Sequence, residues 1–197
     1  MVPLTVNCFG QFTVTMGQQP VASFRTDKVR ALLAYLAPEV RPHRREALAA
    51  LLWPNISEEY AQKNLRNTLH RLRQPLQAFD PALVDPLLVS TRQTIALDPT
   101  YLTVDVQQFE ALLSASASHA RGADATREAH LAHCADCLAR LTQAAELYQG
   151  ELLAGFTLAD APLFEEWLVL RCEALHRELV VLLFDLALGR ADVRPGA

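Results

Sequence analysis

The sequence predicts an α+β fold in which a small antiparallel sheet, three helices and a hairpin precede a half built only of helices. Apolar and polar residues alternate over residues 4–16, which indicates strands. Leucines then recur at helical spacing up to residue 78. Beyond a turn signal at Asp98-Pro99-Thr100, only helical patterns remain. We therefore divide the chain into residues 1–98 and residues 99–197.

Short strands open the chain. Residues 4–8 and 12–16 both alternate, and we expect them to form a hairpin that turns at Gly10-Gln11. A second turn over residues 17–20 leads to an expected third strand at residues 21–24. The sheet therefore comes before any helix.

Two short helices are expected next. Thr26 is expected to cap the first, which Pro38 ends. Pro42 precedes the second, HRREALAALLW, which Pro54 ends. A longer helix over residues 57–78 follows, so the three form a trihelical arrangement of the helix-turn-helix type.

The helix over residues 57–78 has one apolar face and one basic face. Ser57 is expected to supply the capping oxygen, and no acidic residue occurs between Glu59 and Asp80. The apolar stripe consists of Leu65, Leu69, Leu72 and Leu76. The opposite face carries Lys63, Asn67, His70, Arg71 and Gln74, with Arg66 and Arg73 on one flank.

Such a helix suits the major groove of DNA. Lys and Arg neutralise phosphates and read guanine, whereas Asn and Gln read adenine. A solvated surface helix would show a similar pattern, so the flanking elements must decide. Strands expected at residues 87–90 and 94–97 place Arg92 at a hairpin tip, either to reach a phosphate or the minor groove or only to aid solubility. Sheet, three helices and hairpin are together typical of a winged helix.

Charge is distributed unevenly between the two halves. Residues 1–98 hold 11 Lys/Arg and 8 Asp/Glu, whereas residues 99–197 hold 7 and 14, so the net charge of −4 combines +3 with −7. A basic half beside an acidic half favours nucleic-acid binding by the first. No apolar run is long enough to cross a bilayer, and the N-terminus lacks signal-peptide features. We expect a cytoplasmic protein with no membrane partner.

The second half is predicted to be a helical-repeat module, similar to tetratricopeptide repeats. Asp105 is expected to cap its first helix, and a loop is expected over residues 115–124. One long helix over residues 126–149, ended by the glycine that follows, would pair with a second over residues 161–188.

Metal-capable side chains gather on one face of the predicted long helix. They are His130, His133, Cys134 and Cys137. One straight helix cannot wrap four ligands around an ion, so a site would need groups from elsewhere, such as His119, Cys172 or His176. The simpler interpretation makes the cysteines small core residues. We assign no metal ligand and no cofactor from the sequence, and a metal- or thiol-responsive switch stays an alternative.

No catalytic residue is predicted. The chain contains no P-loop, GxGxxG or GxSxG, and its Ser, His and Asp residues lie scattered without a nucleophile context. We therefore do not expect an enzyme.

Seven stretches together resemble bacterial transcriptional activators that fuse a response-regulator-type winged helix to a bacterial transcriptional activator domain, as in antibiotic-pathway regulators. In chain order they are FGQFTVTMGQQPV, KVRALLAYLA, REALAALLWP, NLRNTLHRLRQPL, VDVQQFEALL, AAELYQGELL and FEEWLVLRCEAL. The combination of LLWP, NLRNTLHRLR, DVxxFE and LYxGxLL carries the resemblance, which covers nearly the whole chain.

The resemblance implies a sequence-specific activator that binds direct repeats in double-stranded DNA, as a homodimer at least on DNA, and recruits RNA polymerase. The DNA-contacting residues that it implies are Lys63, Asn64, Asn67, Thr68, His70 and Arg71. Arg66 and Arg73 would contact the DNA backbone or form internal ion pairs. The loop from residue 53 to residue 60 would touch polymerase through Asn55, Glu58 and Glu59. Both glutamates would also favour the helix dipole.

Two features depart from the family. We expect the helical half to be truncated, because about two more helical pairs would follow it in the family, and we expect no receiver domain in this chain. Residues 179–184 are more apolar than an exposed last helix should be, so we expect this face either to belong to a longer protein or to pair with a second copy. An alternative function is a protein-interaction module with weak or no DNA binding, in which the helical half covers the basic face.

Overall fold

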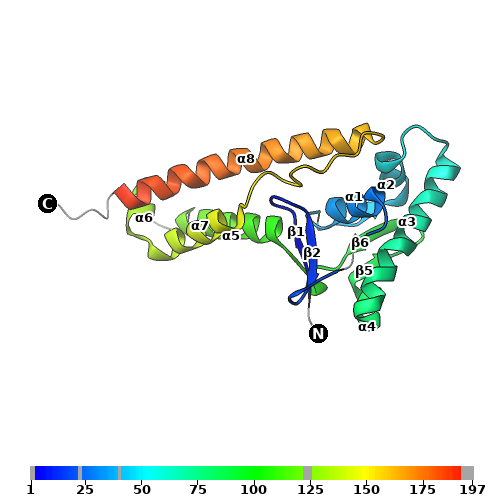
Figure 1. Cartoon of the computed structure of the whole chain (residues 1–197). Coiled ribbons are helices and arrows are strands. Elements are labelled where there is room, and N and C mark those ends of the chain that lie inside the picture. Colours follow the sequence, from blue (N-terminus) through cyan, green and yellow to red (C-terminus); the bar gives the residue numbers. More distant parts are fainter. Residues whose placement is uncertain (1–2, 22–23, 40, 122–125, 192–197) are drawn as a thin grey trace.

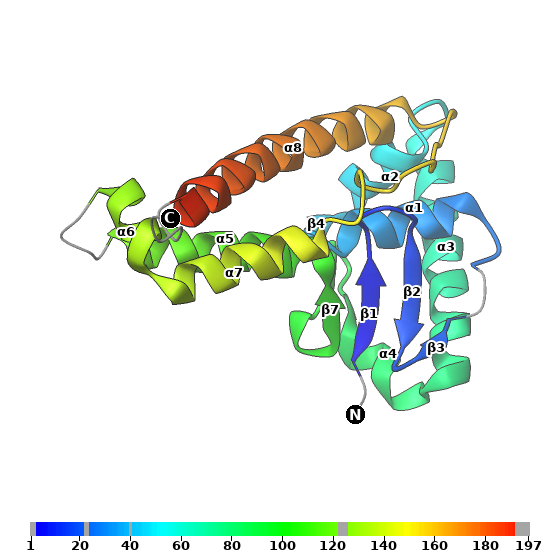
Figure 2. The same cartoon turned by 60° about the vertical axis from the view of Figure 1, so that its left-hand side comes forward.

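A four-stranded sheet lies at the centre of the molecule, with helices of the first predicted half on one side and most helices of the second on the other (Figures 1 and 2). The computed structural model describes residues 3–21, 24–39, 41–121 and 126–191. In spatial order the strands are β3 (Gln19–Pro20), β2 (Thr13–Met16), β1 (Leu4–Asn7) and β7 (Leu102–Val104). The fold is therefore α+β, with a small N-terminal sheet and a mostly helical C-terminal part.

Strand β1 joins the two predicted halves. It pairs antiparallel with β2, where Leu4 lies opposite Met16, and parallel with β7, where Leu4 lies opposite Leu102. The hairpin of β1 and β2 was predicted, whereas β7, which follows residue 98, was not. The third strand was expected at residues 21–24 but occupies Gln19–Pro20; residues 22 and 23 lie outside the described part. Elements from both predicted halves thus share one sheet.

Three helices of the first half are present where the leucine pattern placed them. They are α1 (Asp27–Leu36), α2 (Arg45–Leu52) and α3 (Glu58–Phe79), and α3 packs against both others. Thr26 and Ser57 occupy the N-cap positions, but neither side chain makes a capping hydrogen bond. The prediction that Ser57 supplies a capping oxygen was wrong in this respect.

A second sheet follows α3. The short helix α4 (Pro81–Leu87) begins at Asp80, whose carboxylate accepts from the backbone N–H of Ala82 at 2.9 Å. The predicted hairpin then forms from β5 (Leu88–Ser90) and β6 (Thr94–Leu97). An unpredicted strand, β4 (His43–Arg44), adds to its edge, so the second helix starts two residues later than the sequence suggested.

The helical part differs from its prediction in two places. Its helices are α5 (Asp105–Arg121), α6 (Arg127–His133), α7 (Ala135–Leu147) and α8 (Pro162–Ala191). The loop expected at residues 115–124 was wrong up to residue 121, because α5 continues there; residues 122–124 lie outside the described part. The single helix expected over residues 126–149 was also wrong. It is interrupted at Cys134, whose φ of −100° and ψ of 94° are extended, not helical.

The segment after α7 packs against the end of β1. Gly10, after β1, and Gly150, after α7, lie against each other. A Cβ added to Gly10, which has φ of 72°, would come within 3.3 Å of the carbonyl oxygen of Gln149. Backbone hydrogen bonds join Gly10 N–H to Glu151 O at 2.9 Å and Leu153 N–H to Cys8 O at 2.7 Å. Gly150 therefore serves this contact, and α7 ends earlier, at Leu147.

Helix α8 spans the molecule. One end packs against α2 and the other against α6 and α7 (Figures 1 and 2). In the apolar stretch at residues 179–184, Leu182 is buried, whereas four neighbours are more than half exposed: Val180, Val181, Leu183 and Phe184. Within the described residues, no helix is both long and apolar enough to cross a bilayer.

Candidate nucleic-acid interface

Helix α3 is anchored by its leucines. Leu65 and Leu72 are 0% exposed, and Leu69 and Leu76 are 2% and 1% exposed. Burial of four leucines on one face of a 22-residue helix fixes its rotation about its own axis, because each fully buried leucine contributes about 2 kcal/mol. The side opposite this stripe must then face solvent.

The exposed side of α3 carries the polar residues that the sequence singled out. Its solvent-exposed side chains are Lys63, Arg66, Asn67, His70, Arg71 and Gln74, while Asn64 and Arg73 are half-buried. His70 and Gln74 contact each other at 3.2 Å, between Nε2 atoms. Thr68 lies on the other side of the helix and is only 5% exposed, next to the leucine stripe, so its hydroxyl does not reach the exposed surface.

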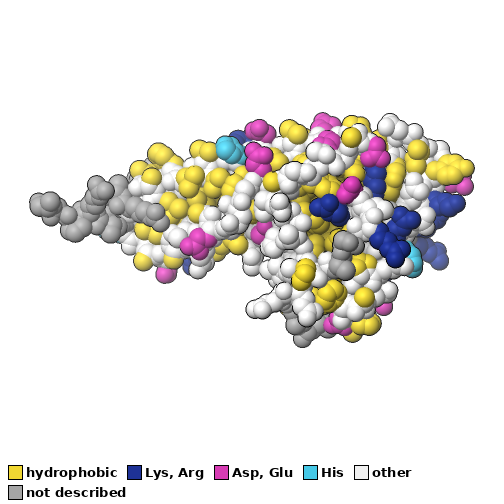
Figure 3. All heavy atoms as spheres, in the orientation of Figure 1, with side chains coloured by type: hydrophobic (Ala, Val, Ile, Leu, Met, Phe, Trp, Pro, Cys, Tyr) yellow, Lys and Arg dark blue, Asp and Glu magenta, His cyan; other side chains and the backbone are white. Residues whose placement is uncertain are grey.

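Positive charge concentrates at this end of the molecule. In Figure 3 the Lys and Arg side chains gather where Figure 1 places α2 and α3. Within the described residues, none of the basic side chains of α3 forms an ion pair. The cationic surface is thus open to an anionic ligand.

Arg45, at the start of α2, belongs to the same surface but was not singled out from the sequence. Its Nε donates to Thr91 O at 2.9 Å and its Nη2 to Ser90 Oγ at 2.7 Å, so it ties α2 to the hairpin. Burial, followed by the nearby guanidinium groups of Arg73 and Arg66, lowers the pKa of Arg45. The signal that could have found it is the Arg44-Arg45 pair directly before a helical pattern.

The hairpin tip is held in a defined turn. The Oγ1 atom of Thr91 accepts from the backbone N–H groups of Gln93 at 3.1 Å and Thr94 at 2.9 Å. Arg92, between Thr91 and Gln93, is exposed. A fixed turn with an exposed guanidinium can contact a phosphate with little loss of backbone entropy.

The loop before α3 is exposed as well. The predicted polymerase contacts, Asn55, Glu58 and Glu59, are all exposed. Two apolar neighbours, Ile56 and Tyr60, are 43% and 64% exposed. Glu58 and Glu59 occupy the first turn of α3, where they also complement the positive end of the helix dipole.

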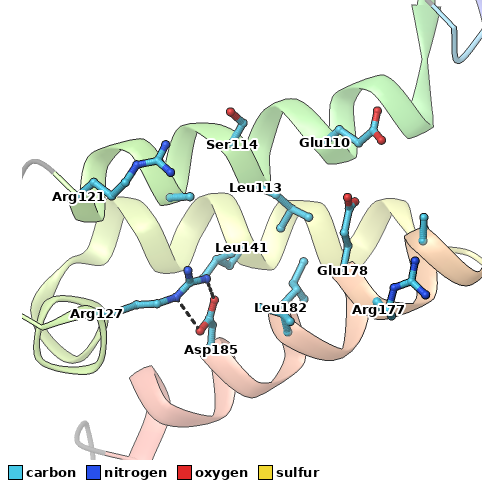
Figure 4. A pocket seen from close by; sticks show the side chains of 13 residues that line it. Glu110, Leu113, Ser114, Arg121, Arg127, Leu141, Arg177, Glu178, Leu182 and Asp185 are labelled. Atoms are coloured by element: carbon cyan, nitrogen blue, oxygen red, sulfur yellow. Dashed lines mark hydrogen bonds and ion pairs between the residues drawn. The ribbon is translucent and has the colours of Figure 1, made fainter.

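A separate pocket of about 610 Å³ lies between α5, α7 and α8 (Figure 4). Arg127 pairs with Asp185 across it, and Arg171 pairs with Glu110 at 2.5 Å. Burial, followed by the charge of Glu110, raises the pKa of Glu178. The Oε2 atom of Glu178 is buried and has no hydrogen-bond partner among the described residues. The pocket is lined by both acidic and basic side chains, whereas the exposed side of α3 after its first turn carries only basic and neutral ones.

Comparison with known proteins gives a likeness of fold. No protein-family model matches the chain, and no curated protein matches it in sequence. The solved structure of Mycobacterium tuberculosis EmbR in complex with a low-affinity phosphopeptide superposes with a TM-score of 0.68 at 23% identity. The match covers 92% of this chain and 44% of EmbR, so it includes both the sheet-containing part and the helical part. The chain spans less than half of EmbR.

Proposed function

We propose that this protein is a sequence-specific DNA-binding transcriptional regulator in which residues 1–98 form a winged helix and α3 enters the major groove. One observation carries the proposal: the leucine stripe of α3 is buried while its basic, amide-bearing side is exposed. A helix in the major groove reads base edges through such side chains, and cations around it neutralise phosphates.

The exposed residues take different roles. Arg71 and Lys63 contact phosphates or guanine, and Asn67 reads adenine. Arg92 at the hairpin tip reaches the backbone or the minor groove, while Arg45 holds that hairpin against α2. Thr68 has no direct contact with DNA in this proposal, because its side chain is buried.

Two further observations support the proposal. The fold likeness to EmbR extends across both the sheet-containing part and the helical part of this chain, as the family resemblance of the sequence motifs would require. The alternative, an interaction module, requires the helical half to cover the basic face, yet Lys63, Asn67 and Arg71 are exposed. The phosphopeptide belongs to EmbR and forms no part of the proposal.

The finer parts of the proposal follow the family resemblance. The regulator activates transcription in the cytoplasm, binds direct repeats as a homodimer at least on DNA, and contacts RNA polymerase through the loop with Asn55, Glu58 and Glu59. It has no enzymatic activity and needs no cofactor for DNA binding. Exposure of that loop supports the polymerase contact.

The proposal is tested by binding duplexes selected from a random pool. We expect Arg71→Ala to weaken binding of the selected duplex about tenfold and to reduce the salt slope by about one, because one phosphate or guanine contact is lost. Arg177→Ala is the matched control: it removes the same charge from an exposed position on α8. Melting temperatures of both variants report whether the fold is intact.

Failure to select any duplex would overturn the proposal. Equal weakening by Arg71→Ala and Arg177→Ala would also overturn it, because binding would then depend on net charge and not on the face of α3.

A further inference from the structure

Four metal-capable side chains converge where α5, α6 and α7 meet. They are His119, His130, Cys134 and Cys137. Their nearest ligand atoms all lie within 4.8 Å of one another. Cys137 is buried, His130 and Cys134 are half-buried, and His119 is exposed at the rim. The cluster lies in the helical part, away from α3.

The break between α6 and α7 makes this convergence possible. Because Cys134 is extended, the chain changes direction there, and His130, Cys134 and Cys137 do not lie along one straight helix. The Sγ atom of Cys134 caps α7 by accepting from the N–H of Cys137 at 3.5 Å. Helix α5, which packs along α7, supplies His119.

The distances match a tetrahedral ion. With Zn–S of about 2.3 Å and Zn–N of about 2.05 Å, sulfur and nitrogen ligands of one tetrahedron lie about 3.6 Å apart. Cys137 Sγ lies 3.4 Å from both His119 Nδ1 and His130 Nε2. Cys134 Sγ lies 3.7 Å from His119 Nδ1. Three edges of the tetrahedron are therefore already close to their final length.

We propose that His119, His130, Cys134 and Cys137 form a closed Cys₂His₂ site for a divalent transition-metal ion, with Zn²⁺ as its occupant. Two thiolates and two imidazoles are ligands that zinc prefers, and two thiolates balance its charge. Four protein ligands leave no open position, so the ion is structural. It links α5 to the junction of α6 and α7.

Arg140 completes the surroundings of the site. Its Nη1 lies 3.4 Å from His119 Nδ1, the nitrogen that must face the metal. The side chain is half-buried, so on metal binding it turns outward or donates to a thiolate. A donor to a ligand sulfur is a common outer partner of zinc sites.

A histidine and a cysteine outside the cluster provide controls. His133 Nδ1 contacts the carbonyl of Ala129 in its own helix at 3.0 Å. Cys172 Sγ contacts Leu152 O at 3.7 Å. Neither belongs to the group of converging ligands.

The test is titration of the reduced, metal-stripped full chain with Co²⁺ and then Zn²⁺. We expect one equivalent of Co²⁺ to produce the visible bands of tetrahedral, thiolate-bound cobalt, and one equivalent of Zn²⁺ to abolish them with submicromolar affinity. We expect Cys137→Ser and His119→Ala to lower zinc affinity at least 100-fold. Cys172→Ser and His133→Ala should change it less than threefold.

A second readout, the rate of cysteine alkylation, uses the wild-type chain and so does not require any variant to fold. One equivalent of Zn²⁺ should slow alkylation of Cys134 and Cys137 in the wild-type chain at least tenfold while leaving Cys172 unchanged, as mapped by mass spectrometry. The proposal is overturned by octahedral cobalt spectra, by micromolar or weaker zinc affinity, or by equal losses in cluster and control variants. A Cys134–Cys137 disulfide that persists in the presence of thiol reductant would overturn it as well.

Discussion

Asp105 shows how one buried carboxylate can join two parts of a chain. Its oxygens accept from the backbone N–H groups of Cys8 at 2.9 and 2.8 Å, of Phe9 at 2.8 Å and of Val106 at 2.8 Å. Burial raises its pKa, against the opposing effect of these donors, so the ionised carboxylate is held at a cost. The sequence predicted that Asp105 caps α5, but Asp105 is the first residue of this helix. Its bond to Val106 reaches the N–H of the next residue, not the second or third N–H that a capping side chain binds.

Asp105→Ala should therefore destabilise the protein strongly. The buried N–H groups of Cys8 and Phe9 would lose their acceptor, which costs roughly 3 kcal/mol in total. Asp105→Asn keeps one acceptor oxygen and should lose less. Urea unfolding of the three proteins measures the difference, and a loss below about 1 kcal/mol for Asp105→Ala would contradict the assignment.

Burial of Glu178 makes the stability of the protein depend on pH. Since burial raises its pKa in the folded state, the folded protein takes up the proton before the unfolded chain does. The penalty for burying the charge is complete above the folded pKa and disappears below the unfolded pKa of about 4.3. We expect Glu178→Gln to raise the melting temperature at pH 7 and to have little effect at pH 4. Glu173→Gln, exposed on the same helix, is the control and should show no such pH-dependent gain.

At the scale of the element, α3 and α4 differ in whether the N-cap side chain makes a hydrogen bond. Ser57 occupies the N-cap of α3 without a side-chain hydrogen bond, whereas Asp80 bonds Ala82 N–H at the start of α4. We expect Ser57→Ala to change stability by less than about 0.5 kcal/mol and Asp80→Ala to cost about 1 kcal/mol. Urea unfolding of both variants tests this, and a larger loss for Ser57→Ala would show that its hydroxyl caps α3 in solution.

The spacing of apolar residues predicted those helices and strands that bury a single face. The leucine stripe of α3 and the alternation in β1 and β2 each follow from burial on one side, so their positions agree with the sequence. Strands β4 and β7 have two and three residues, and their pairing partners are distant in sequence. Such short segments have no period of their own, so only tertiary contacts define them.

The candidate sites also differ in whether residue spacing or tertiary contacts define them. The exposed face of α3 could be located because helical spacing fixes which residues lie opposite the leucines. The sequence named His119, Cys172 and His176 as possible partners for the ligands of the predicted long helix but could not choose among them, because the choice depends on how α5 packs along α7. Nothing in the sequence marks the extended backbone at Cys134 that separates α6 from α7. Arg45 was missed because its role depends on the distant hairpin.

At the scale of the whole molecule, α8 and the segment before it tie the helical part to α1 and α2. Trp167 stacks edge-on against Tyr35 of α1, with ring centroids 4.8 Å apart. Lys28 of α1 pairs with Asp160, just before α8, at 2.8 Å and donates to Leu52 O at 2.5 Å, at the end of α2. Together with the strand pair of β1 and β7, these contacts predict one cooperative unit and not two independent ones.

Trp167→Ala tests this cooperativity. We expect a loss of about 2 kcal/mol, below the range for a fully buried tryptophan because Trp167 is half-buried. In this variant Trp53 is the remaining tryptophan, so its fluorescence reports the first half while far-ultraviolet circular dichroism reports all helices. One cooperative unit requires both signals to shift to the same lower urea midpoint. Leu170→Ala, at an exposed position on α8, should shift neither, and separate midpoints for the two signals in Trp167→Ala would show that the halves unfold independently.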